Sequence, residues 1–207
     1  MLQESKRRAL GSSSRHCAMQ YTFHDMQPHA RDDIRLRKAS PKDATLLSRL
    51  AATLFAQTFA ESNTPQDMAT YLDQTFRVEL QEAELADPAC VTWLAEDARG
   101  NAVGYAMLWQ GSRIESVQAK HPAEIQRIYA DRSMHGRGVG AALMRACVDQ
   151  ARAWGCDVLW LAVWEKNARA IAFYEKMGFR RVGATTFQLG SDRQRDDVMA
   201  RTLTDEA

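Results

Sequence analysis

Three glycines at alternate positions, Gly136, Gly138 and Gly140, stand where a strand-like segment and its loop lead into a helix-like segment. Because glycine has no Cβ, backbone N–H groups at such a loop can close around a bulky anion, and the positive end of the helix dipole adds to the attraction. The segment therefore predicts a strand, loop and helix unit whose loop binds a pyrophosphate.

Two other phosphate-binding motifs fit these glycines less well. A P-loop needs Lys and then Ser or Thr after its last glycine, whereas Val139 follows Gly138. Gly136, Gly138 and Ala141 formally satisfy the dinucleotide fingerprint, but residues 131–135 lie where that fingerprint has a tight turn. Too little chain follows for a second nucleotide half, so a nicotinamide site is disfavoured. A loop that serves only a tight helix entry stays open as the structural alternative.

Hydrophobic periodicity predicts a mixed sheet with helices on its faces. Ser40-Pro41 and Thr64-Pro65 are typical helix starts, in which a capping residue precedes proline. The run 158–164 is continuously apolar, as expected of a strand buried on both faces. The predicted order is βααβββαβαββ, with strands at 34–39, 90–95, 102–109, 124–130, 158–164, 179–189 and 197–202 and helices at about 41–59, 65–85, 139–154 and 167–176.

One folded domain is expected at residues 34–203. Residues 1–33 show no apolar period of 2 or 3.6, and their first sixteen residues carry four basic side chains against one acidic side chain. We therefore predict a basic, irregular N-terminal extension. Either it is disordered, or the start of the protein is wrongly assigned and Met19 or Met26 is the true first residue.

Charge and cysteine usage exclude several classes of protein. With 27 basic and 26 acidic residues, the net charge of +1 leaves no basic excess for a nucleic-acid backbone. The four cysteines form no Cys-x-x-Cys pair, and Cys147 and Cys156, which are nine positions apart, have no His partner at metal-ligand spacing. Zinc and disulfide frameworks are therefore disfavoured, and the reducing cytoplasm fits. The longest apolar stretch, 102–109, is too short to span a bilayer.

Two segments resemble signatures of the GNAT superfamily of N-acetyltransferases. The segment from His135 to Gly140 is similar to its acetyl-CoA loop, Gln/Arg-x-x-Gly-x-Gly/Ala, with His at the first position, and residues 167–179 are similar to the second signature. The resemblance covers about 34–203. It implies a GNAT-like mixed, mostly antiparallel central sheet of about seven strands with helices on both faces. It also implies acetyl-CoA as co-substrate, no metal, and a homodimer.

A narrower resemblance is to the PaiA-type bacterial acetyltransferases, a group associated with spermidine and spermine acetylation. It rests on residues 58–59, 63–68, 124–129, 163–167 and 189–192. It implies direct transfer from acetyl-CoA to a polyamine or other small primary amine, and neither Cys147 nor Cys156 is placed for a covalent acyl-enzyme. A protein or peptide N-acetyltransferase and a non-catalytic acetyl-CoA-binding regulatory module stay open as alternatives.

The reaction needs a base, because an ammonium with a pKa near 10.4 is about 3 units from neutral at pH about 7.4. Glu124 is the predicted base, since it lies eleven positions before His135, the spacing at which many GNAT members place their catalytic glutamate. Glu165, after the apolar strand, is the rival, and Asp131 is a third candidate. The structural alternative for Glu124 is a carboxylate paired with Arg127 or merely solvated.

The resemblance also implies that Tyr174 protonates or hydrogen-bonds the leaving sulfur. Tyr174 lies about two helical turns after Asn167, so both side chains share a face, and Asn167 is a typical helix cap. A backbone N–H freed at a bulge around 128–130 is expected to stabilise the oxyanion. The predicted cofactor-binding residues are Ile128, Tyr129, Ala130, His135, Gly136, Arg137, Gly138, Val139, Gly140, Ala141, Asn167 and Tyr174.

Aromatic and acidic side chains outside these motifs are weaker candidates for acceptor contacts. Tryptophans usually indicate core or cleft lining, although an aromatic wall can also hold a cationic amine. Acids on the early helices usually indicate a solvated face, although they could attract a polycation. The residues concerned are Trp109, Trp160 and Trp164, the acids Glu61, Asp67, Glu79, Glu82 and Glu84, and the cluster Asp192, Asp196 and Asp197, which is expected to frame the acceptor entrance.

Overall fold

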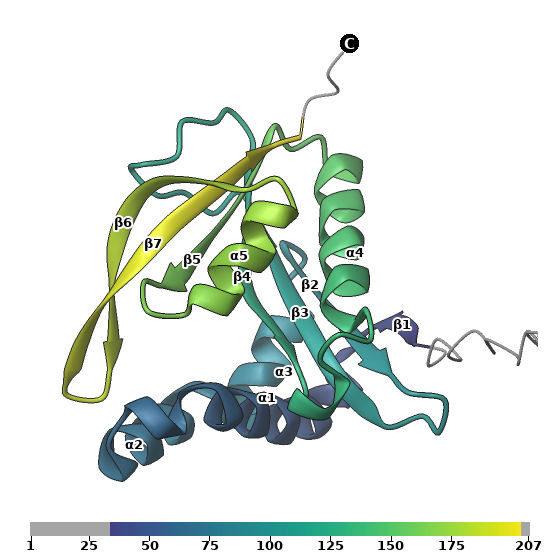
Figure 1. Ribbon diagram of the computed structural model, residues 1–207. Coiled ribbons are helices and arrows are strands. Elements are labelled where there is room, and N and C mark those ends of the chain that lie inside the picture. The colour runs from purple at the N-terminus through teal and green to yellow at the C-terminus, as the bar shows by residue number, and fades with distance from the viewer. Residues whose placement is uncertain (1–33, 204–207) are drawn as a thin grey trace, which may run out of the picture. The chain divides into compact units, whose positions relative to one another are not determined.

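The computed structural model describes residues 34–203, and the N-terminal extension predicted at 1–33 lies outside them. Seven strands and five helices occur among the described residues (Figure 1). The strands are β1 Arg35–Lys38, β2 Cys90–Glu96, β3 Ala102–Gln110, β4 Pro122–Ala130, β5 Val158–Trp164, β6 Arg180–Leu189 and β7 Asp192–Thr202. The helices are α1 Ala44–Phe59, α2 Pro65–Thr75, α3 Val78–Ala86, α4 Val139–Ala153 and α5 Ala168–Lys176.

All seven strands form one sheet in the order β1-β2-β3-β4-β5-β7-β6. Each neighbouring pair is antiparallel except β4 and β5, which are parallel. The predicted mixed, mostly antiparallel sheet of seven strands is therefore confirmed.

The segment predicted as one helix from 65 to about 85 is two helices, α2 and α3, so the element order is βαααβββαβαββ. Phe76 is 3% exposed, and Arg77, which follows it, has extended backbone with φ -60 and ψ 146. The chain turns here to place the Phe76 ring in the core. Tertiary packing overrides the local helix propensity that predicted continuity.

The last strand, β7, begins at Asp192 rather than at Asp197. Gly190 and Ser191 form the turn, and Leu189 pairs directly with Asp192 across it. The first five residues of β7 are polar or charged. Because they pair with β6 through backbone groups, an apolar alternation does not reveal them.

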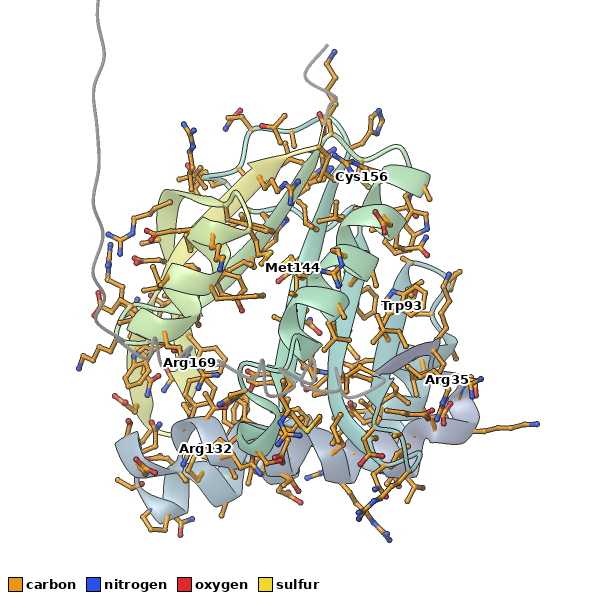
Figure 2. All side chains as sticks on the ribbon, turned by 45° about the vertical axis from the view of Figure 1, so that its right-hand side comes forward. Arg35, Trp93, Arg132, Met144, Cys156 and Arg169 are labelled. Carbon is orange, nitrogen blue, oxygen red and sulfur yellow. The ribbon has the colours of Figure 1, made fainter. Side chains whose placement is uncertain are left out.

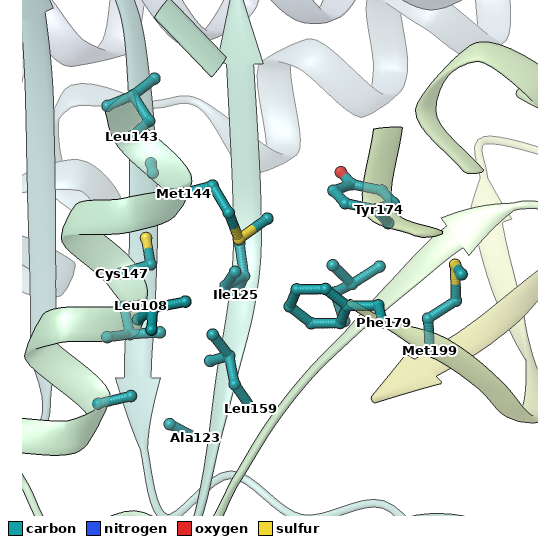
Figure 3. Packing of buried hydrophobic residues seen from close by; sticks show 14 of the residues in the cluster. Leu108, Ala123, Ile125, Leu143, Met144, Cys147, Leu159, Tyr174, Phe179 and Met199 are labelled. Atoms are coloured by element: carbon teal, nitrogen blue, oxygen red, sulfur yellow. The ribbon is translucent and has the colours of Figure 1, made fainter. Parts of the chain in front are cut away.

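Two buried clusters pack against opposite faces of the sheet, since successive strand residues point to opposite sides. Leu143, Met144 and Cys147 of α4 share one cluster with Ile125 of β4 (Figure 3). The α1 and α2 side chains pack in the other cluster with alternate residues of β2 and β3. The predicted helices on both faces of the sheet are thereby confirmed.

The cysteines among the described residues are buried free thiols: Cys90, Cys147 and Cys156. Burial raises the pKa of Cys147 to about 12, so this thiol is not ionised at neutral pH and is a poor nucleophile. Among residues 34–203, no helix combines the length and the apolar character needed to cross a bilayer.

Candidate active site

The parallel strands β4 and β5 are hydrogen-bonded neighbours only at their beginnings. Pro122–Glu124 is in register with Val158–Trp160, whereas β4 continues to Ala130 and β5 continues to Trp164. Residues from both diverging ends line a cavity of about 700 Å³, which also reaches the first turn of α4 and side chains of α1 and α2. One continuous space therefore joins the glycine loop to Glu124.

A bulge at Gln126 changes which β4 side chains face this space. Ile125 and Arg127 pair with consecutive residues of β3, so Gln126 is the extra residue. The predicted bulge at 128–130 is wrong, because those residues pair regularly with β3. The extra residue resets the alternation of side chains, so that Arg127 reaches α3 on the same side of the sheet that Glu124 faces.

The loop before α4 has the backbone that the glycines predict. Gly136 and Gly138 have φ of 80 and 88, in the left-handed region that favours glycine, and Gly138 is the N-cap of α4. Asp131 shapes the entry to the loop, because its carboxylate accepts hydrogen bonds from the Ser133 backbone at 2.8 Å and from Gln57 at 2.9 Å.

This loop fits a pyrophosphate. A Cβ added at Gly136 or Gly138 would meet nothing within 4 Å, so the space beside these residues is not filled by protein. The first backbone N–H groups of a helix have no partner within the helix and attract anions. The loop residues and the first residues of α4 line the cavity, so these donors are available to a bound anion.

All predicted cofactor-binding residues except Arg137 line the cavity. The cavity wall also includes Arg169 and Lys176, and an adjoining hollow of about 240 Å³ is lined by Arg132, Lys166 and Arg169. Figure 2 labels Arg132 and Arg169 on that side of the molecule. The sequence motifs did not predict these four cations, whose charges suit a ligand with several phosphates.

His135, at the first position of the loop motif, supports the loop through its ring. The Nε2 atom lies 3.2 Å from the backbone oxygen of Ala130, the last residue of β4. Partial burial lowers the pKa of His135, so the neutral imidazole with its proton on Nε2 can donate to that carbonyl.

Glu124 occupies the point where β4 and β5 separate, and its side chain is half-buried in the cavity wall. Burial raises its pKa, while a hydrogen bond of 2.5 Å that the Ser112 hydroxyl donates to Oε2 opposes the shift. Trp160 fixes this donor by donating from Nε1 to the Ser112 backbone oxygen at 3.0 Å. The alternative in which Arg127 neutralises Glu124 is wrong, because Arg127 binds both carboxylate oxygens of Glu84 at 2.8 and 3.0 Å.

The two other candidate bases have other partners. Oε2 of Glu165 accepts a hydrogen bond from Arg195 Nη1 at 2.8 Å, and Glu165 is not part of the cavity wall. Hydrogen bonds from Ser133 and Gln57 lower the pKa of Asp131, which makes it a weak base. The geometry therefore favours Glu124.

Tyr174 and Asn167 both line the cavity from α5. The Asn167 side chain also caps this helix, since it accepts a hydrogen bond from the Ala170 backbone at 3.1 Å. The Tyr174 ring packs between Phe173 and Phe179, and its hydroxyl points away from Phe179 in Figure 3. Burial raises the pKa of Tyr174, so the hydroxyl keeps its proton at neutral pH and can donate it in a hydrogen bond.

The part of the cavity beneath α1 and α2 has an aromatic wall, which we call the aromatic half. Within it, the Phe59 ring lies 6.1 Å from that of Trp164, and the Tyr71 ring lies 5.4 Å from that of Phe187. Trp164 thus lines the cavity, as one of the two readings of the tryptophans expected. Trp109 and Trp160 are not part of the cavity wall, and their indole N–H groups donate to Gln126 and Ser112. The rings of the aromatic half are Phe55, Phe59, Tyr71, Phe76, Tyr129, Trp164 and Phe187.

The start of α2 packs on the turn between β6 and β7, next to the aromatic half. Oδ1 of Asp67 accepts a hydrogen bond of 2.5 Å from the Ser191 backbone, and Asn63 accepts one of 2.6 Å from Gln194. The chains approach so closely that a Cβ at Gly190 would lie 2.7 Å from the Asp67 Cα. Asp67 therefore has a structural role rather than forming part of a solvated face.

The three aspartates of β7 do not act as one cluster. Asp192 accepts a hydrogen bond from Gln194 at 2.9 Å, and Asp197 forms ion pairs with Arg181 and Arg195. Asp196 alone among the three lines the cavity. The sequence signal that would have singled out Asp196 is an acidic residue at an inward-facing strand position. To recognise it, the prediction would have had to start β7 at Asp192 rather than at Asp197.

Comparison with known proteins agrees with this geometry. A family described as acetyltransferase (GNAT) family matches residues 55–179. An uncharacterised N-acetyltransferase of Lactobacillus delbrueckii subsp. lactis is 32% identical over 170 residues, which cover 82% of this chain and 98% of that protein.

Two solved structures have the same fold. The PaiA N-acetyltransferase of Thermoplasma acidophilum in complex with coenzyme A has a TM-score of 0.65 at 19% identity, over 82% of this chain and 98% of its own. Mutant forms of the spermidine/spermine N-acetyltransferase SpeG from Vibrio cholerae have a TM-score of 0.59 at 20% identity, over 83% and 94% of the two chains.

Proposed function

The chain belongs to the acetyltransferase (GNAT) family, and from this premise we propose that it transfers the acetyl group of acetyl-CoA to the primary amine of a small acceptor, of the polyamine class. The observation that carries the proposal is that Glu124 and the glycine loop open onto one cavity. A donor bound at the loop and an acceptor at Glu124 can therefore meet without crossing solvent.

The residues present fit acetyl-CoA, which supplies an activated acetyl thioester when bound. Backbone N–H groups at residues 136–140 would hold its diphosphate, and Arg169 and Lys176 would add positive charge to the same wall. Between β4 and β5, the pantetheine arm would find unpaired backbone groups, since within residues 34–203 no strand pairs with β4 on that side beyond Glu124.

Glu124 would take the proton from the acceptor ammonium at one of its carboxylate oxygens. Its charge is not already neutralised by Arg127, and burial makes it a stronger base than a solvated glutamate. Ser112 holds one oxygen, Oε2, which leaves Oε1 as the atom that accepts the proton. The protonated hydroxyl of Tyr174, which lines the same cavity from α5, would donate to the departing sulfur.

The shape and charge of the aromatic half favour a small amine over a protein substrate. A folded acceptor or a peptide needs an open trough, whereas Asp67 fastens α2 to the β6–β7 turn and the Tyr71 ring lies 5.4 Å from that of Phe187, so the α2 and β6 walls of the aromatic half are held together. Aromatic rings and carboxylates together suit an aliphatic ammonium.

The test is free-thiol release from acetyl-CoA by the purified protein across a panel of polyamines, monoamines, amino acids and peptides. Turnover confined to small aliphatic amines would support the proposal. Turnover with peptides alone would instead favour a protein or peptide N-acetyltransferase. Acetyl-CoA binding without turnover on any amine would favour a regulatory module.

A further inference from the structure

We propose that Asp196 forms a second cation-binding subsite in the aromatic half, which takes the distal ammonium of an acceptor that carries two charged amines. The inference rests on the proposed function and deepens it, because it names the residue that recognises the second charged amine of a diamine or longer polyamine.

Asp196 is a buried carboxylate with no hydrogen-bond or ion-pair partner for its side chain among the residues that the structure describes. It is 9% exposed, and its Oδ1 atom is enclosed with no hydrogen bond to any of residues 34–203. Its neighbour Asp197, which is 1% exposed, differs in having Arg181 and Arg195 as ion-pair partners. Burying an ionised carboxylate without compensation costs stability, so the fold alone gives no reason for an acid at this position.

The charges around Asp196 leave its carboxylate available to a cationic ligand. The guanidinium that shares this half of the cavity, Arg127, is held by both oxygens of Glu84. Arg195 is occupied by Glu165 and Asp197. Burial together with the nearby charge of Glu165 raises the pKa of Asp196 to about 6. The group is therefore largely ionised above pH 7, and a bound ammonium would relieve its desolvation.

Asp196 and Glu124 lie on the same face of the sheet at different heights. Glu124 is in register with Trp160 of β5, and Asp196 is in register with Trp164, four residues further along that strand. Four residues of a strand span about 13 Å. A single amine cannot contact both carboxylates, whereas an extended chain with an amine at each end can.

The surface around the two carboxylates suits the carbon chain of such an acceptor. The Phe59 ring contacts both Trp164, level with Asp196, and Tyr129 of β4, at 6.1 and 6.5 Å between centroids. Methylene groups would pack on these rings while the ends of the acceptor reach Glu124 and Asp196. The site thus combines apolar contact along the chain with charge at its ends.

The experiment compares diaminooctane with octylamine, which share a chain length and differ in the distal amine. The ratio of their kcat/KM values is measured for the wild-type protein, for Asp196→Asn and for Asp149→Asn, whose side chain is exposed on α4. Loss of one charge-assisted contact is expected to lower the ratio roughly tenfold to hundredfold in Asp196→Asn. Asp149→Asn should retain the wild-type ratio. Thermal melting verifies that both variants fold.

An unchanged ratio in Asp196→Asn, or a wild-type protein that acetylates octylamine with no preference for diaminooctane, overturns the inference while the proposed function stands. If the wild type acetylates neither these two amines nor any other small amine of the panel, the proposed function fails, and calorimetric titration with diaminooctane then decides about the subsite. Binding to the wild type that Asp196→Asn weakens supports the subsite. Equal binding, or none, overturns it.

Discussion

Replacement of Glu124 by Gln removes the ability of this side chain to accept a proton while keeping its size and shape. The amide has the size of the carboxylate, and its oxygen can still accept the hydrogen bond that Ser112 donates at 2.5 Å. The variant cannot take a proton from an ammonium. Any loss of activity in Glu124→Gln therefore reports on the base rather than on the packing of the cavity.

The expected magnitude follows from the acceptor and from the surroundings of Glu124. About one aliphatic amine in a thousand is neutral at pH 7.4, a handicap of about 4 kcal/mol. Burial raises the pKa of Glu124 above its usual 4.5, which narrows the gap to the pKa of the amine. General-base catalysis typically contributes about 10²- to 10⁴-fold. We expect kcat/KM of Glu124→Gln to fall about a hundredfold or more at pH 7.4.

The assay is thiol release from saturating acetyl-CoA between pH 7 and 10, with the concentration of a small amine varied below and above its KM so that kcat/KM is measured at each pH. The neutral fraction of the amine rises about tenfold per pH unit in this range, so at high pH the amine binds already deprotonated and needs no base. The difference in kcat/KM between Glu124→Gln and the wild type should therefore shrink towards pH 10. The matched control is Glu82→Gln, an exposed glutamate on α3 that should behave as the wild type. A deficit that stays constant with pH, or activity within a factor of a few of the wild type at pH 7.4, would refute the assignment.

Thermal unfolding separates this result from a loss of structure. A carboxyl whose pKa is raised in the folded state stabilises the fold when protonated. That contribution is lost as pH rises from 4.5 through the folded pKa. At pH 7 the ionised Glu124 therefore lowers the free energy of unfolding, and Glu124→Gln should melt at the same temperature as the wild type or at a higher one. A lower melting temperature would indicate that the side chain has a structural role.

Three further predictions concern the donor, the loop and the half-buried ion pair. Tyr174→Phe should lower kcat roughly tenfold to hundredfold in the thiol assay with little change in the Kd for acetyl-CoA, and an unchanged kcat would remove the hydroxyl from the reaction. Gly138→Ala, at φ 88, strains the loop by about 1–2 kcal/mol and should raise the calorimetric Kd for acetyl-CoA about tenfold; an unchanged Kd would show that the diphosphate binds elsewhere. Glu84→Gln leaves Arg127 without its counter-charge and should lower the free energy of unfolding in urea by about 3 kcal/mol, whereas a neutral result would mean that solvent already screens the pair.

Local sequence patterns predicted most of the elements that form the site. The glycines of the loop require particular backbone angles, and the φ values of 80 at Gly136 and 88 at Gly138 agree with that requirement. The cap at Asn167 and the helix that follows it depend on residues three or four positions apart. Such features could be predicted because their causes lie within a few residues of one another.

The tertiary structure decided which side chains meet in the cavity. Glu124 receives its hydrogen bond from Ser112, twelve residues away, and Asp67 is joined to Ser191, at a sequence separation of 124. The bulge at Gln126 and the separation of β4 from β5 arise from the pairing of whole strands. Periodicity shows that a segment forms a strand. Which strands become its neighbours, and where two neighbours separate, depends on the free energy of packing the whole sheet.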